Sequence, residues 1–141
     1  MKQINRWLCV MSTVLVCVSA QADTLKAVMQ LNSGSLDVVL RGIRNAIEIS
    51  EEAGRQSVLL DLKVVISGPA VDQFEKGMSP DLANTFQELL KFKDVHSFIC
   101  GRTLNKIHKD MKELLPGLAK VSSGAFEVLL LERQGYFYIK P

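Results

Sequence analysis

Cysteine is scarce in this chain, and its distribution excludes a domain built on disulfides. The 141 residues contain three cysteines, and two of them, Cys9 and Cys17, fall within the first 22 residues. Small secreted domains that depend on disulfides need a dense, even set of cysteines. Cys100 stands alone in the rest of the chain. A lone thiol of this kind is buried and inert, paired between chains, or kept for chemistry.

Histidine is also scarce, and the chain has almost no excess of basic over acidic residues. The two histidines, His96 and His108, are too far from Cys100 in the predicted strand and helix for a simple Cys/His dyad, and they make a poor zinc site. The chain has 17 basic and 15 acidic residues, and Lys2 and Arg6 account for the difference. Nucleic-acid-binding domains carry clustered lysine and arginine. We therefore expect no nucleic-acid partner, no metal and no other cofactor.

Several common catalytic motifs are absent from the sequence. It contains no Gly-x-Gly-x-x-Gly, no Walker sequence and no Gly-x-Ser-x-Gly nucleophile elbow. Conventional dehydrogenase, kinase and hydrolase functions are therefore not indicated.

The first 22 residues have the pattern of a secretory signal peptide. Lys2 and Arg6 precede an uncharged run over residues 7–18, and Ala20 and Ala22 supply the small residues of a cleavage site. The run is shorter than the ~20 residues of a membrane-spanning helix, which disfavours the alternative of a retained anchor. A lipoprotein modified at Cys17 is disfavoured by the bulky residues 14–16. We expect cleavage after Ala22, a periplasmic domain over residues 23–141, and no membrane association after cleavage.

Strand and helix patterns alternate along the rest of the chain. Strands are predicted over 25–31, 58–66, 95–100, 118–121 and 136–139. Helices are predicted over 36–53, 80–90, 103–115 and 125–134, with a short helical turn over 71–75. Such alternation is typical of βαβ units. It predicts one α/β domain with a mostly parallel five-stranded sheet and helices on both faces.

Small polar residues follow the predicted strands. The carboxyl ends of parallel strands meet at one edge of a sheet, where ligands bind. Tight turns alone also favour glycine and serine, so each loop taken singly has a purely structural explanation. Together the loops favour a small-ligand or reactive-group pocket. Its candidate binding residues are Asn32, Gly68, Arg102, Thr103 and Ser123.

Cys100 is the candidate catalytic residue at this edge. It ends a predicted strand, and Thr103 is a candidate N-cap of the following helix. Amides and the dipole at a helix start favour an anion, which lowers a thiol pKa. Arg102 would add positive charge or orient an anionic sulfur substrate, and Gly101 would let a partner approach the sulfur. A buried structural cysteine is an equally compatible alternative.

Three segments resemble the DsrE/DsrF-like family, whose fold is also called YchN-like. They are VISGPA at 65–70, VHSFICGRTL at 95–104, and the C-terminal part formed by VSSG at 121–124 and residues 131–141. The resemblance implies a flavodoxin-like three-layer fold and a homo-oligomer, either a trimer or a hexamer. In active members it implies a cysteine that accepts sulfane sulfur as a persulfide, with a donor or acceptor protein as partner. Cys100 matches that cysteine, whereas the predicted signal peptide departs from the cytoplasmic sulfur-relay members.

Two hypotheses for function follow. The first is a periplasmic sulfur carrier, or a sulfurtransferase-like enzyme, that accepts sulfane sulfur on Cys100. The second is a non-enzymatic oligomeric protein of the same fold, with a small-ligand-binding or structural role.

Overall fold

Five parallel strands form the centre of the computed structural model, which describes residues 23–141. The predicted signal peptide lies outside these residues. The sheet order is β4-β3-β2-β1-β5, and every neighbouring pair is parallel. The strands are β1 (Leu25–Leu31), β2 (Leu60–Ile66), β3 (Val95–Cys100), β4 (Leu118–Val121) and β5 (Phe137–Ile139). The predicted strands are confirmed, although β2 and β5 begin later than expected.

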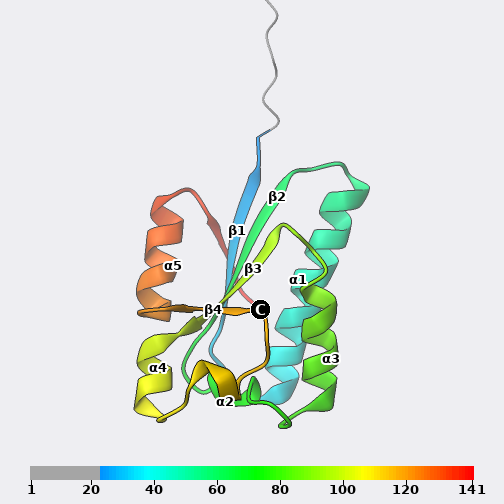
Figure 1. Ribbon diagram of the computed structural model, residues 1–141. Coiled ribbons are helices and arrows are strands. Elements are labelled where there is room, and N and C mark those ends of the chain that lie inside the picture. Colours follow the sequence, from blue (N-terminus) through cyan, green and yellow to red (C-terminus); the bar gives the residue numbers. More distant parts are fainter. Residues whose placement is uncertain (1–22) are drawn as a thin grey trace, which may run out of the picture.

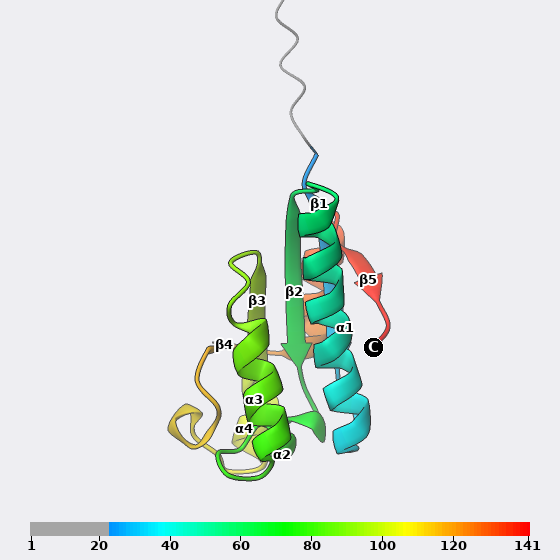
Figure 2. The same cartoon turned by 90° about the vertical axis from the view of Figure 1, so that its right-hand side faces the viewer.

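Helices cover both faces of this sheet. Figure 1 shows α1 (Leu36–Arg55) and α3 (Pro80–Leu89) on one side and α4 (Gly101–Lys106) and α5 (Gly124–Arg133) on the other. The short α2 (Ala70–Gln73) lies at the carboxyl edge. In Figure 2, α1 and α3 lie next to each other in front of the sheet. The expected flavodoxin-like, three-layer architecture is confirmed. Within residues 23–141, no helix is long and apolar enough to span a membrane.

Local sequence explains where several helices begin and end. Pro80 occupies the first turn of α3, and the Ser79 side chain accepts a hydrogen bond from the Leu82 amide at 3.2 Å. At the end of α5, Gly135 has a φ of +89°, the left-handed conformation that commonly ends helices. Helix α1 continues past residue 53, where the predicted helix ends, to Arg55, so Gly54 lies within its last turn.

The predicted helix over 103–115 is wrong. Helix α4 ends at Lys106, His108 has a φ of 56°, and a separate 3₁₀ turn covers Met111–Glu113. The apolar spacing suits a continuous helix, but tertiary hydrogen bonds hold the second half elsewhere. The Leu115 amide donates to the Phe74 carbonyl at 2.8 Å, which ties this segment to the end of α2.

The two faces of the sheet have cores of unequal size. Most of the buried apolar side chains lie under α1 and α3, where the rings of Phe74 and Phe86 pack edge to face with centroids 5.3 Å apart. The α5 face has a small core, formed by Val28, Val65, Val128, Leu131 and Tyr136. Contacts other than apolar packing therefore matter more for α5.

A polar tie fixes the chain just after α5 to the sheet. The Tyr136 hydroxyl donates to Asp61 Oδ2 at 2.5 Å, and Lys63 Nζ lies 2.8 Å from Asp61 Oδ1. Burial and this hydrogen bond raise the pKa of Tyr136 to about 12. Burial raises the pKa of Asp61, but the hydrogen bonds from Lys63 and Tyr136 outweigh it, so the net pKa is lowered. Asp61 therefore stays ionised and Tyr136 neutral at physiological pH.

Candidate functional site

Cys100 lies at the junction of β3 and α4. It is the last residue of β3 and also the N-cap of α4, with φ −71° and ψ 112°. The predicted N-cap, Thr103, is instead the third residue of the helix. The helix starts two residues earlier than expected because the chain turns directly at Cys100, with no intervening loop.

The start of α5 packs closely against Cys100. A Cβ built on Gly124, the first residue of α5, would lie 3.2 Å from the Cβ of Cys100 and 2.9 Å from that of Ser67. Because no larger residue fits at this distance, the glycine brings the α5 backbone against the ends of β2 and β3.

Four polar groups at the starts of α4 and α5 lower the pKa of the Cys100 thiol, and they are the Thr103 hydroxyl and the backbone amides of Gly124, Thr103 and Arg102. The Cys100 side chain makes no capping hydrogen bond to α4. Cys100 is 6% exposed, and this burial raises the thiol pKa. The polar groups of α4 and α5 outweigh burial, so the pKa of Cys100 lies below its ordinary value.

Gly68 supports the Thr103 hydroxyl. The Gly68 amide donates to Thr103 Oγ1 at 3.1 Å, which fixes the position of the hydroxyl that lowers the pKa of the Cys100 thiol. Gly68 has a φ of +55°, a conformation that favours glycine. The structure thus brings together three residues singled out from the sequence, Gly68, Cys100 and Thr103.

The other predicted binding residues contribute less directly. The Arg102 amide donates to the Ser122 carbonyl at 3.1 Å, while the Arg102 side chain is exposed. The Ser123 side chain caps α5 by accepting from the Phe126 amide at 3.5 Å. Asn32 is exposed, and its backbone carbonyl lies near Gly68. These three side chains are not among the groups that lower the thiol pKa.

Gly101 does not open the sulfur to a partner as expected. It is buried, and a Cβ at this position would lie 2.8 Å from Lys120 Cε and 2.8 Å from the Val121 carbonyl oxygen. The glycine is required by the packing of β4 against the start of α4.

Sequence reasoning missed Gly124 and the polar pair beside it. Gln30 Nε2 donates to Ser67 Oγ at 3.1 Å, and Ser67 in turn lies against Gly124. The alternation of side chains between the two faces of a strand could have predicted the position of Gln30. Gln30 points to the same face of the sheet as Val28, the face that α5 covers.

A cavity of about 280 Å³ adjoins the thiol site. Its lining residues come from the chain around α2 and from α4, and they are Gly68, Pro69, Asp72, Thr103, Lys106 and Ile107. Thr103 belongs both to this cavity and to the groups that lower the thiol pKa. The carboxyl edge therefore places the Cys100 thiol next to a space for a small molecule.

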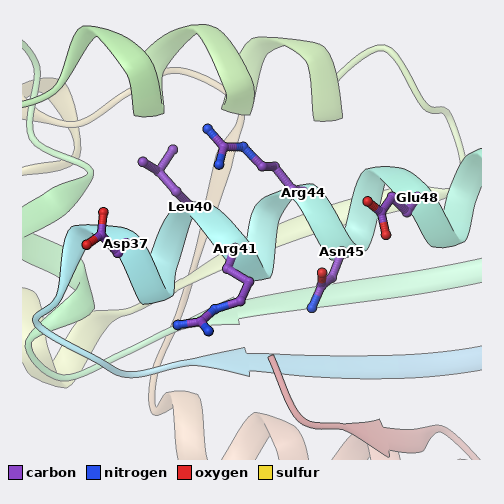
Figure 3. Close-up of a pocket in the computed structure, with 6 residues that line it drawn as sticks. All are labelled: Asp37, Leu40, Arg41, Arg44, Asn45 and Glu48. Atoms are coloured by element: carbon purple, nitrogen blue, oxygen red, sulfur yellow. The ribbon is translucent and has the colours of Figure 1, made fainter.

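A larger hollow, of about 440 Å³, lies on the opposite face of the sheet (Figure 3). It is lined by one stretch of α1 that includes Asp37, Arg41, Arg44 and Glu48, and it does not include the thiol. Within residues 23–141, no three His, Cys, Asp or Glu side chains gather in a way that could hold a metal ion.

Replacing Thr103 with valine is expected to raise the thiol pKa. Valine has a similar shape but no hydroxyl, so one of the four groups that lower the pKa is lost. The pH dependence of iodoacetamide alkylation measures this, with the midpoint moving to higher pH than in the wild type. Thr85→Val is the control, because the Thr85 hydroxyl donates to the Asp81 carbonyl on exposed α3. Equal midpoints in all three proteins would show that Thr103 does not tune the thiol.

Comparisons with known proteins show similarity in structure. No family model matches the chain, and no curated protein matches it in sequence. Solved structures similar to it include the protein of unknown function MTH1491 from Methanobacterium thermoautotrophicum and the ychN protein from E. coli. The first has 22% identity and a TM-score of 0.72, and the second 16% and 0.68. In each case 83% of this chain and 99% of the other are covered. At these identities the likeness shows the fold alone, and that fold is the YchN-like one implied by the sequence resemblance.

Proposed function

We propose that this protein is a periplasmic sulfur carrier or sulfurtransferase-like protein that accepts sulfane sulfur on Cys100. The observation that carries this proposal is the position of the Cys100 thiol at the end of β3, where the starts of α4 and α5 meet and their polar groups lower its pKa. An inert buried cysteine lies in apolar surroundings that raise its pKa.

The same polar groups suit a persulfide chemically. The Cys100 thiolate attacks a sulfane sulfur, a new S–S bond forms, and the bond between that sulfur and the donor breaks. The donor leaves with the electron pair and takes up a proton. Amides and a hydroxyl placed to stabilise a thiolate also stabilise the charge that builds up during the exchange.

A homo-oligomer, a trimer or a hexamer, and an exchange partner protein belong to this proposal. They are supported by the outer face of α5, where Phe126 is 56% and Leu129 61% exposed. Large apolar side chains that are neighbours on an exposed helix often mark a protein interface. Export to the periplasm is supported by the signal-peptide pattern of residues 1–22.

A second candidate is a non-enzymatic small-ligand-binding protein of the same fold. The 280 Å³ cavity beside Thr103 favours it, because that space does not depend on thiol chemistry. Ligand binding that persists unchanged in Cys100→Ser, without any sulfur transfer in the wild type, would favour this candidate.

Intact mass spectrometry after exposure to polysulfide tests the proposed function. The mature wild-type protein is expected to gain one sulfur atom, which a reductant removes, and Cys100→Ser is expected to gain none. Residues 23–141 contain no other cysteine, so the variant is a clean control. Absence of a gain in wild-type protein whose thiol is shown to be reduced would refute the sulfur-carrier function.

A further inference from the structure

The cavity beside Thr103 carries one charge of each sign. Asp72 lies on α2, and Lys106 ends α4. Among the described residues, neither side chain has an ion-pair partner within 4.0 Å, so they do not pair with each other. Both charges are therefore available to a ligand.

Neighbouring charged groups are already engaged. Lys109 forms an ion pair with Glu75, which raises the pKa of that lysine, and the charge of Asp72 raises it further. Lys76 Nζ donates to the Lys112 backbone carbonyl. Asp72 and Lys106 thus remain as the carboxylate and the ammonium of the cavity that have no ion-pair partner within 4.0 Å among the described residues.

The rest of the lining suits a short apolar linker between two charged groups. Pro69 and Ile107 supply apolar surface, and Gly68 has no side chain to fill the space. The volume of about 280 Å³ is at the small end of ligand pockets, which fits a molecule of amino-acid size.

This arrangement discriminates between classes of sulfur donor. An inorganic dianion would meet Lys106 but would be repelled by Asp72. A zwitterion satisfies both residues, its ammonium group facing the carboxylate and its carboxylate facing the ammonium of the lysine. Opposite charges around an apolar centre are the pattern that recognises a free α-amino acid.

We infer that this cavity binds a zwitterionic amino-acid persulfide, such as cysteine persulfide, as the sulfur donor to Cys100. The inference rests on the proposed function and names its substrate class. The Cys100 thiolate attacks the outer sulfur of the persulfide, and the S–S bond within the donor breaks. The amino-acid thiolate leaves and is protonated, so Cys100 carries the transferred sulfur and no external oxidant or reductant is needed.

Transfer rates from two donors test this inference. In Asp72→Asn and Lys106→Gln, loading of Cys100 from cysteine persulfide is expected to slow about tenfold, because each variant removes one charged contact. Loading from inorganic polysulfide is expected to change less than about twofold. Asp81→Asn and Lys91→Gln, at exposed positions on and just after α3, are matched controls. If the cavity variants changed the rate of loading from cysteine persulfide and from polysulfide by the same factor relative to the wild type, the zwitterion site would be overturned. The sulfur-carrier function would still stand.

Binding to a protein without the thiol separates the two proposals. Calorimetry is expected to show that the Cys100→Ser protein binds S-methyl-L-cysteine. Adding Asp72→Asn to this variant is expected to weaken the binding about tenfold. If this binding occurs but the wild type accepts sulfur from neither donor, the cavity proposal stands as a ligand site and the sulfur-carrier function fails. Absence of both binding and donor discrimination would overturn the inference.

Discussion

Replacing Gly124 with alanine is expected to lower the free energy of unfolding by about 2 kcal/mol and to raise the pKa of the Cys100 thiol. The added Cβ would lie 2.9 Å from Ser67 Cβ and 3.2 Å from Cys100 Cβ, so the start of α5 must move away from the sheet. That movement withdraws the Gly124 amide from the sulfur. Urea unfolding measures the first effect and the pH profile of alkylation the second.

Gly54→Ala is the matched control for this variant. A Cβ at Gly54 meets nothing within 4 Å, and the residue lies inside α1. Alanine is expected to stabilise the protein by about 0.5–1 kcal/mol there and to leave the thiol unchanged. If both glycine variants behaved alike, close packing of α5 against Cys100 would not be a determinant of the site.

Replacing Phe74 with alanine is expected to have the largest effect on stability, about 3–5 kcal/mol. Phe74 is fully buried, packs edge to face on Phe86, and accepts a backbone hydrogen bond from the Leu115 amide. Removing the ring leaves a cavity between α3 and the segment after α2. Because that segment follows Asp72, sulfur loading from cysteine persulfide is also expected to slow.

Phe137→Ala provides the comparison for Phe74→Ala. The same chemical change at a side chain that is 69% exposed is expected to alter the free energy of unfolding by less than about 0.5 kcal/mol. Chemical denaturation of the three proteins under one set of conditions decides the matter. A cost near 1 kcal/mol at Phe74 would mean that the region relaxes around the missing ring and does not hold the carboxyl edge rigidly.

The sequence predicted the fold well because its signals are local. Apolar strands alternate with amphipathic helices, and the parallel sheet follows from that order. The predicted helix over 103–115 failed because its second half is fixed by contacts with the distant Phe74 and Lys76, which no local periodicity records. In most of the chain the local apolar periodicity and the tertiary contacts favour the same structure. In this segment they differ, and the tertiary contacts determine the conformation.

The candidate site was predictable only in part, for a related reason. Cys100 ends β3, and Gly68 and Thr103 come soon after β2 and β3, whose carboxyl ends meet at one edge, so their proximity follows from topology. The Gly124 amide reaches the sulfur only because α5 begins in close contact with β2 and β3. Asp72 and Lys106 share a cavity through the placement of α2 beside α4, which the sequence does not reveal.

The unequal cores on the two faces have a consequence for access to the buried sulfur. The α5 layer rests on a small apolar cluster and is tied beyond its far end by Tyr136 and Asp61, whereas α1 and α3 cover the large core. Regions with few buried contacts open at lower free energy, so we expect α5 amides to exchange hydrogen sooner than those of α1. A sub-global fluctuation that lifts the Gly124 end of α5 would uncover Cys100 while the rest of the fold stays closed. The thiol would then be accessible only while the less stable α5 layer is open. While this layer is closed, the thiol would be shielded from oxidants in solution.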